Sequence, residues 1–504
     1  MTTKTLNTET ATISLTDLGK HNKETDCWIA VHSKVWDITN FINEHPGGPS
    51  ALLKCAGSNA TRIFDEVHAP DILEELPDEK FIGILQDATP DAVATASQPA
   101  TGDTMSTAVS KTAQTLNMPI EEDKAIPPLG SIIGAPDLES VASKALTPKA
   151  WAFYSSAATD LITHKNNKRL VRRIMIRPRI LRNVSHVDMR TNILGFETSA
   201  PFFISPAAMA KLVHPDGELA LSRGAASEGI IQCISSNASY TLKSIVSAAP
   251  PTHPFFFQLY VNSERQKTIE ILRSARSLGI KAVFVTVDAP VPGKREADER
   301  AAQAGTVRAA ISGAESSSDN KGSGLGRLMA QYIDNSITWE DLTWIREASG
   351  VPVVLKGVQT ADDVRLAVAY GLDGVLLSNH GGRSLDGSQA SILKAMPQVF
   401  DKLEIYIDGG FERGSDILKA VALGATAVGV GRPFLYSLVY GQKGVEHLSQ
   451  ILKDELETSM RLCGITSLSQ ATPAMVNTLD IDYLVVPEES SRQKMSVKRS
   501  WSKL

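Results

Sequence analysis

The chain has 504 residues, a formal net charge of −5 and a hydrophobic fraction of 42%. This length predicts at least two domains, and the slight acidity gives no reason to expect a nucleic-acid partner. No apolar run is long enough to span a bilayer, so we expect no membrane partner, and four scattered cysteines disfavour a zinc site and favour a reducing compartment.

The first block, residues 10–87, contains short strand-like runs separated by polar turns. His45-Pro46-Gly47-Gly48 follows these runs, and His68 lies 23 residues after His45. Neutral imidazoles from two separate segments can hold haem iron from opposite sides. Two histidines alone are more often ordinary surface residues, but this motif and spacing resemble the cytochrome b5 haem domain. The resemblance implies a small α+β domain for electron transfer, with haem b bound through His45 and His68.

Residues 88–117 differ in composition, because they contain no aromatic residue and are rich in Ala, Thr, Ser and Pro. Such a segment cannot bury enough apolar surface to fold, so we expect a flexible linker. A hinge would allow an electron donor and its acceptor to meet and part. A plain spacer remains the alternative.

The second block, residues 118–486, begins with a predicted helical entry over residues 137–156. Strand-like and helical patterns then alternate, and the eight strand-like runs are residues 201–205, 231–235, 255–260, 282–288, 352–356, 374–379, 405–408 and 427–431. Eight β/α units predict an α/β fold, the (β/α)8 TIM barrel. A doubly wound open sheet is the alternative, but it more often carries an early GxGxxG turn, which this sequence lacks.

Nearly every predicted strand of this block ends in a polar residue or a glycine. Because the active sites of TIM barrels lie at the C-terminal strand ends, we expect these residues to share one site. Glycines after the last two strands, each before a helical pattern, suit a phosphate. Lys356 could stabilise a reduced flavin ring, so FMN fits the inventory, although the residues alone leave other phosphate ligands open.

The loop after the sixth predicted strand, residues 378–386, reads SNHGGRSLD. His380 could take a proton near neutral pH, and Arg383 could hold a carboxylate through two hydrogen bonds. A histidine on a loop is more often an ordinary polar residue, so the interpretation depends on the other strand ends.

The second block resembles the family of FMN-dependent α-hydroxy-acid oxidases and dehydrogenases over almost its whole length. The matching motifs are PAAMAKL (206–212), FQLYVN (257–262), TVDAPVPGKRE (286–296), LKGVQTADD (355–363), SNHGGRSLD (378–386), DGG..RG (408–414) and GRPFLY (431–436). A haem domain followed by such a barrel is similar to the flavocytochrome b2 branch of this family.

The resemblance implies oxidation of a 2-hydroxy acid such as L-lactate to the 2-oxo acid. Electrons would pass from FMN to haem and then to an acceptor such as cytochrome c. It also implies a homotetramer. Two alternatives remain: a peroxisomal oxidase that reduces oxygen, and a haem electron carrier with an inactive barrel.

The resemblance also assigns residue roles. His380 would be the base, with Asp288 raising its pKa, Tyr260 bonding the substrate hydroxyl, Arg383 and Arg295 holding the carboxylate, and Lys356 stabilising reduced flavin. The FMN ring would contact Pro206, Ala207, Ala208, Ser235, Gln258, Thr286, Lys356 and Ser378. The ribityl chain and phosphate would contact Asp408, Gly410, Arg413, Gly431 and Arg432. If His380 takes the hydroxyl proton, the C2 hydrogen leaves as hydride; if it takes the C2 proton, a carbanion forms.

Three positions depart from the family pattern. Phe153 stands where a carboxylate-binding tyrosine is usual, so one hydroxyl contact is missing. Glu412 replaces an arginine and would oppose phosphate binding unless it turns away. Asn237 stands where relatives often have an apolar or aromatic residue that sizes the pocket, so a longer or more polar hydroxy acid is expected.

Two further segments lie outside these motifs. Residues 297–327, after the fourth predicted strand, are small, polar and rich in Gly and Ser, so we expect them to be disordered, either as a lid or as an idle insertion. The tail 487–504 ends in Ser502-Lys503-Leu504, which predicts a peroxisomal address; cytoplasm is the alternative, because no N-terminal mitochondrial presequence is evident.

Overall fold

The computed structural model describes residues 11–42, 45, 49–61, 63–64, 73, 80–86, 126–302, 306–316, 322, 324–389 and 401–484. The chain divides into two compact units, residues 1–125 and 126–504. His68, residues 88–117 and the tail 487–504 with its terminal tripeptide lie outside the described residues.

The N-terminal unit is built on a five-stranded sheet of order β1-β5-β4-β3-β2, in which only β1 and β5 pair in parallel. The strands are β1 (Thr12–Ile13), β2 (Asn22–Lys23), β3 (Asp26–Val31), β4 (Lys34–Asp37) and β5 (Phe81–Leu85). The short helices are α1 (Leu15–Leu18), η1 (Thr39–Phe41) and α2 (Pro49–Leu53). Ile29, Trp36 and Ile42 lie in the core on one side of this sheet, and the predicted small α+β domain is confirmed.

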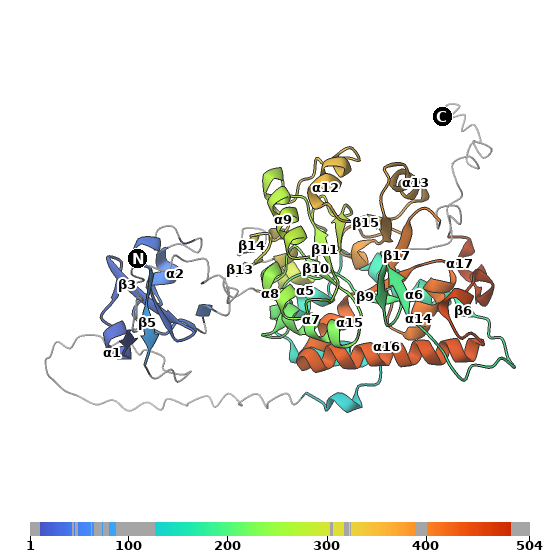
Figure 1. Cartoon of the computed structure of the whole chain (residues 1–504), viewed down its shortest axis with the longest axis horizontal. Coiled ribbons are helices and arrows are strands. Elements are labelled where there is room, and N and C mark those ends of the chain that lie inside the picture. Colours follow the sequence, from blue (N-terminus) through green and yellow to red (C-terminus); the bar gives the residue numbers. More distant parts are fainter. Residues whose placement is uncertain are drawn as a thin grey trace, which may run out of the picture. The chain divides into compact units, whose positions relative to one another are not determined.

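The C-terminal unit is a closed barrel of eight parallel strands, as predicted (Figure 1). In spatial order the strands are β9 (Phe202–Ile204), β10 (Gln232–Ser235), β11 (Phe255–Leu259), β12 (Ala282–Thr286), β15 (Val353–Val358), β16 (Gly374–Leu377), β17 (Glu404–Asp408) and β18 (Ala427–Val430). Aromatic rings fill its interior. The ring centroids of Phe256 and Phe284 lie 5.4 Å apart, and those of Phe203 and Tyr406 lie 5.9 Å apart. The interior is therefore a packed core, and the strand ends are left to form the site.

Helices that follow the strands along the chain cover the barrel from outside (Figure 1). They include α7 (Gly217–Ser227), α8 (Leu242–Ser247), α9 (Arg265–Ser277), α12 (Asp341–Ser349), α13 (Ala361–Ala369), α14 (Gly414–Ala422), α15 (Arg432–Ser437) and α16 (Gly441–Cys463). The predicted helical entry is wrong in one detail: it forms two helices, α4 (Ala135–Ala145) and α5 (Pro148–Ser155). Pro148 disfavours helical backbone in Thr147, whose side chain instead caps α5 by accepting from the Ala150 amide.

The insertion between β12 and β15 contradicts the expectation of disorder wherever it is described. It contains α10 (Glu296–Arg300), the antiparallel pair β13 (Val307–Arg308) and β14 (Glu315–Ser316), and α11 (Leu325–Leu328). Buried Asp298 pairs with Lys149 at 2.6 Å and accepts from the Gly326 amide at 3.0 Å. These tertiary contacts order a segment whose composition suggested disorder.

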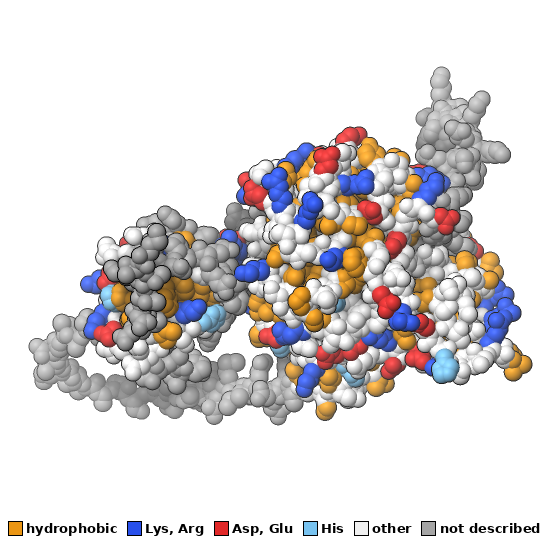
Figure 2. Space-filling model, in the orientation of Figure 1, with side chains coloured by type: hydrophobic (Ala, Val, Ile, Leu, Met, Phe, Trp, Pro, Cys, Tyr) orange, Lys and Arg blue, Asp and Glu red, His pale blue; other side chains and the backbone are white. Residues whose placement is uncertain are grey.

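The surface of the barrel unit carries both signs of charge, interspersed on the face that Figure 2 shows. Among the described residues, no helix is long and apolar enough to cross a membrane.

Candidate active site

The C-terminal strand ends of the barrel surround one cavity, and most of the predicted site residues line it. Those lining it are Pro206, Ala207, Ala208, Ser235, Gln258, Tyr260, Thr286, Arg295, Lys356, His380, Arg383, Asp408, Gly410, Gly431 and Arg432. Asp288 and Ser378 stand behind this lining, where each contacts His380. Arg413 lies outside the cavity lining.

His380 is held in a defined orientation between two side chains. It lies in η6 (His380–Gly382) with a φ of 58°, a left-handed conformation uncommon for a residue with a side chain and typical of functional sites. Its Nδ1 lies 2.8 Å from Asp288 Oδ1, and its Nε2 lies 3.2 Å from the Tyr260 hydroxyl. Because a carboxylate only accepts, Nδ1 carries the proton, which leaves the Nε2 lone pair on the side of Tyr260.

The pKa of His380 lies below its ordinary value, although Asp288 raises it as expected. Burial lowers the pKa most, and the charges of Lys356 and Arg295 lower it further, while Asp288 raises it. The imidazole is therefore neutral near pH 7, in the state that can accept a proton.

Lys356 forms the floor of the site with two carboxylates nearby. Its Nζ donates to Ser378 Oγ at 3.2 Å and lies 3.9 Å from Asp408 Oδ2. Burial lowers its pKa, but Asp288 and Asp408 raise it by more, so the ammonium stays charged. The next residue is Gly357, with a φ of 108°; a Cβ there would lie 2.5 Å from the Asp288 Cβ. Only glycine therefore lets the aspartate sit against this strand.

The guanidinium groups of two half-buried arginines flank Phe153. The Arg383 guanidinium carbon lies 5.1 Å from the centre of the ring, and that of Arg295 lies 5.9 Å from it. Arg383 donates to the Tyr154 carbonyl oxygen at 3.0 Å, and Arg295 Nε is buried without a hydrogen bond. Neither arginine has a carboxylate within 4.0 Å among the described residues. The phenyl ring at 153 thus holds two cations that lack an anion.

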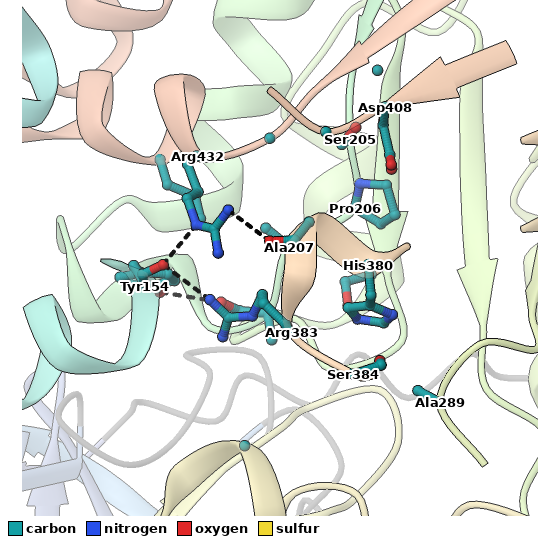
Figure 3. A pocket seen from close by; sticks show the side chains of 18 of the residues that line it. Tyr154, Ser205, Pro206, Ala207, Ala289, His380, Arg383, Ser384, Asp408 and Arg432 are labelled. Atoms are coloured by element: carbon teal, nitrogen blue, oxygen red, sulfur yellow. Dashed lines mark hydrogen bonds between the residues drawn. The ribbon is translucent and has the colours of Figure 1, made fainter. Parts of the chain in front are cut away.

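Arg432 lies beside Arg383, because both donate to the Tyr154 carbonyl oxygen, and backbone carbonyls fix its position. Its guanidinium donates to the oxygens of Tyr154, Gly381 and Ser156 at 2.9, 3.1 and 3.1 Å. In Figure 3 both Arg432 and Arg383 reach toward Tyr154. Arg432 therefore keeps its full charge facing the cavity beside Gly431, at the start of α15, where an anion is stabilised.

Glu412 lines the same cavity, but its charge is already paired. Its carboxylate lies 2.5 Å from Lys168 Nζ and 3.3 Å from an Arg172 nitrogen, both on α6 (Ile162–Arg173). Arg413 turns to Glu455, at 2.7 Å. Arg413 is therefore paired outside the cavity lining, and its contact with the cofactor stays a prediction.

Two side chains that belong to none of the predicted motifs, His164 and Lys168, also line the cavity. Burial and the charges of Arg432 and Lys168 lower the pKa of His164 to about 3, so it is neutral and can bond Arg432, 3.2 Å away. Lys168 comes four positions after His164, a spacing that places both on one face of a helix and could have identified them as a pair.

The cavity fits FMN, the cofactor inferred for this barrel. Ser205 Oγ and Asp408 Oδ1 are buried at its wall and lack a hydrogen-bond partner. Buried polar atoms are rarely left unpaired, so a polar ligand is expected beside them. Gln258 donates to Thr286 Oγ at 2.9 Å and accepts from Ser235 Oγ at 3.2 Å, which orients a set of polar groups for a ring edge.

The haem-ligand prediction can be examined only at His45. This histidine is half-buried, and its ring lies edge-on to Phe41, with 5.8 Å between centroids. An imidazole against an aromatic core suits a haem ligand, and its predicted partner, His68, is not among the described residues.

Comparisons with known proteins agree with this arrangement. Residues 142–478 match the FMN-dependent dehydrogenase family, and residues 14–86 match the cytochrome b5-like haem/steroid-binding domain family. The L-lactate dehydrogenase (cytochrome) of Saccharomyces cerevisiae is 40% identical over 495 residues, covering 95% of this chain and 82% of that protein. Glycolate oxidase 3 of Oryza sativa is 40% identical over 350 residues, covering 68% of this chain and 95% of that protein.

A solved structure gives the same result. A flavocytochrome b2 mutant with benzoylformate superposes with a TM-score of 0.65 at 38% identity, covering 76% of this chain and 96% of that one. A mandelate oxidase with (S)-4-hydroxymandelic acid has a TM-score of 0.64 at 31% identity, covering 69% and 98%. The chain therefore belongs to the FMN-dependent dehydrogenase family, in the flavocytochrome b2 arrangement of a cytochrome b5-like domain followed by a barrel, and its cofactors are FMN and haem.

Proposed function

We propose that this enzyme oxidises a small L-2-hydroxy acid of the lactate type to the 2-oxo acid and delivers the electrons through haem to cytochrome c. The two-domain match to an L-lactate dehydrogenase (cytochrome) supports both the substrate class and the acceptor. The observation that carries the chemistry is the oriented His380–Asp288 pair, which lies in one cavity with two guanidinium groups that lack an anion.

In this proposal the substrate carboxylate lies between Arg383 and Arg295. Burial, together with the charges of Arg295 and Arg432, lowers the pKa of Arg383 well below its ordinary value, because crowded cations destabilise one another. A bound carboxylate relieves that repulsion and gains charge-assisted hydrogen bonds. Phe153 cannot add a hydroxyl contact, so the two arginines supply the charge recognition.

The same placement brings the substrate hydroxyl toward Tyr260 and His380. Burial raises the pKa of Tyr260, so its hydroxyl stays protonated and can donate to the oxygen of the substrate. His380 Nε2 accepts a proton from the substrate. The resulting imidazolium is stabilised by Asp288, whose Oδ1 lies 2.8 Å from His380 Nδ1. Asp288 is itself poised as a carboxylate: burial raises its pKa, but His380 and Lys356 lower it by more.

The bound cofactors supply the redox chemistry. When bound, FMN would supply two-electron redox chemistry at the hydroxyl-bearing carbon, and haem would supply single-electron transfer. Lys356 would face the flavin as a buried cation, and Asp408, Gly410, Gly431 and Arg432 would hold the ribityl chain and phosphate.

An anaerobic absorption spectrum before and after addition of L-lactate, glycolate or L-mandelate tests the proposal. We expect the flavin band to bleach and the bands of reduced b-type haem to follow. Flavin that is reduced while haem stays oxidised, with peroxide formed on exposure to air, would instead favour an oxidase. Cofactors that no hydroxy acid reduces would contradict the proposed function.

A further inference from the structure

One polar side chain, Asn237, lies in the cavity wall on the loop that follows β10. It is buried, and it lines the same cavity as Tyr260 and His380. Its carboxamide oxygen accepts from Ser312 Oγ at 2.6 Å and from the Tyr332 hydroxyl at 3.0 Å. Both donors come from the segment between β12 and β15, so a part of the chain that is distant in sequence fixes the side chain of Asn237.

The backbone reinforces this attachment. The Ser312 amide donates to the Ser236 carbonyl at 3.0 Å, and the Ala310 amide donates to the Ala238 carbonyl at 2.9 Å. The segment that holds Ser312 is therefore bonded on both sides of Asn237. Burial raises the pKa of Tyr332, so its hydroxyl remains a donor. The carboxamide oxygen of Asn237 is thus directed at the segment between β12 and β15.

The amide nitrogen of Asn237 makes no hydrogen bond with the described residues, and it is not sealed from the cavity. The lining of this cavity also has apolar members, which include Met329, Ala330 and Ile333. A buried N–H donor loses free energy when a methyl group covers it and recovers that energy when an oxygen faces it.

From this geometry we propose that Asn237 determines substrate specificity by donating a hydrogen bond to an oxygen on C3 of the 2-hydroxy acid. The inference rests on the proposed function and narrows its substrate class to acids with a hydroxyl or carbonyl oxygen on C3. Ser312 and Tyr332 act as positioning residues, because they hold the amide with its nitrogen facing the substrate.

L-Glycerate and L-2-hydroxybutyrate form a matched pair, since they differ by a terminal hydroxyl against a methyl group. With the full-length enzyme carrying both cofactors, kcat/KM for L-glycerate should exceed that for L-2-hydroxybutyrate by about tenfold or more. Asn237→Leu should reverse this preference. Dissociation constants of the products hydroxypyruvate and 2-oxobutyrate, measured from the perturbation of the flavin spectrum, should follow the same order without turnover.

Ser312→Ala and Tyr332→Phe test the positioning role, and they also serve if Asn237→Leu does not fold. Each should reduce the ratio of the two kcat/KM values while the ordinary reaction with L-lactate continues. Glu315→Gln is the matched control, because Glu315 is exposed on β14 of the same hairpin and pairs with Arg308 at 3.5 Å. It should leave the ratio unchanged.

The outcomes separate the inference from the proposed function. If neither acid reduces the flavin and L-lactate also fails, the proposed function is wrong. If both acids turn over and L-glycerate is no better than L-2-hydroxybutyrate, the inference alone is wrong. A ratio that is the same in Asn237→Leu, Ser312→Ala and the unmodified enzyme would also overturn it.

Discussion

At the end of the cavity proposed to bind the substrate (the substrate end), Arg295 and Arg383 have no carboxylate partner among the described residues. At the end proposed to bind the FMN phosphate (the phosphate end), Lys168 is already paired with Glu412 at 2.5 Å and with Glu139 at 2.9 Å. Arg432, between the two ends, bonds carbonyl oxygens and keeps its charge. At the substrate end the two guanidinium groups therefore repel each other until an anion binds. At the phosphate end part of the positive charge is already neutralised by protein carboxylates.

This difference indicates how each end tolerates change. Removing a cation from the substrate end removes the partner of the incoming carboxylate, which is worth more than an exposed ion pair because the site is desolvated. Removing an acidic residue from the phosphate end frees a cation for the cofactor. Single substitutions at the two ends test this contrast.

His380→Gln should abolish most of the activity, because no other described side chain at the substrate end offers a neutral nitrogen base. We expect kcat to fall by about a thousandfold, the order of magnitude of general-base catalysis. Anaerobic flavin reduction measures the step. FMN content should stay unchanged, and a variant that reduces flavin within a few fold of the normal rate would contradict the assignment of the base.

Arg383→Lys should keep the charge and lose the planar donor arrangement. We expect kcat/KM for the hydroxy acid to fall by about a hundredfold, the cost of losing a charge-assisted, two-point contact in a buried site. The affinity for FMN should change little, since Arg383 is expected to face the carboxylate of the substrate. Equal losses in both quantities would remove the distinction between the two ends.

Asp288→Asn should change the pH dependence as well as the rate. Asp288 raises the pKa of His380, and burial lowers it by more. The acid limb of kcat/KM should therefore fall below pH 6.5 in the normal enzyme and move to lower pH in the variant. At pH 7 we expect about a tenfold loss, because the imidazolium loses its counter-ion. A shift of the limb to higher pH would contradict this sign.

Glu412→Gln should have the smallest effect and the opposite sign, tightening the binding of FMN. Its charge lies against Lys168, which also pairs with Glu139 at 2.9 Å, so the substitution leaves this ammonium with one carboxylate partner instead of two and makes more of its charge available to the phosphate. We expect a dissociation constant about fivefold lower, equivalent to roughly 1 kcal/mol. Titration of the apoenzyme with FMN, followed by fluorescence, measures it. Glu455→Gln, which removes the partner of Arg413 outside the cavity, is the control and should not change the affinity.

Much of the fold was predictable because it depends on local patterns. Eight buried strands with polar or glycine ends are visible in the sequence, and all eight appear in the closed barrel. The predictions failed where tertiary contacts override composition. Residues 306–316 are ordered because their backbone forms hydrogen bonds with the loop around Asn237. A composition of small, polar residues does not predict such a contact.

The sequence by itself determined which chemical groups stand at each strand end, because strand length and alternation fix which residues reach the rim of the barrel. It also determined the family, through motifs such as SNHGGRSLD. Only the tertiary structure decided the charge balance among these groups. The pairing of Glu412 with Lys168, the outward turn of Arg413 and the net lowering of the His380 pKa depend on distances and burial across distant segments, which no local pattern encodes.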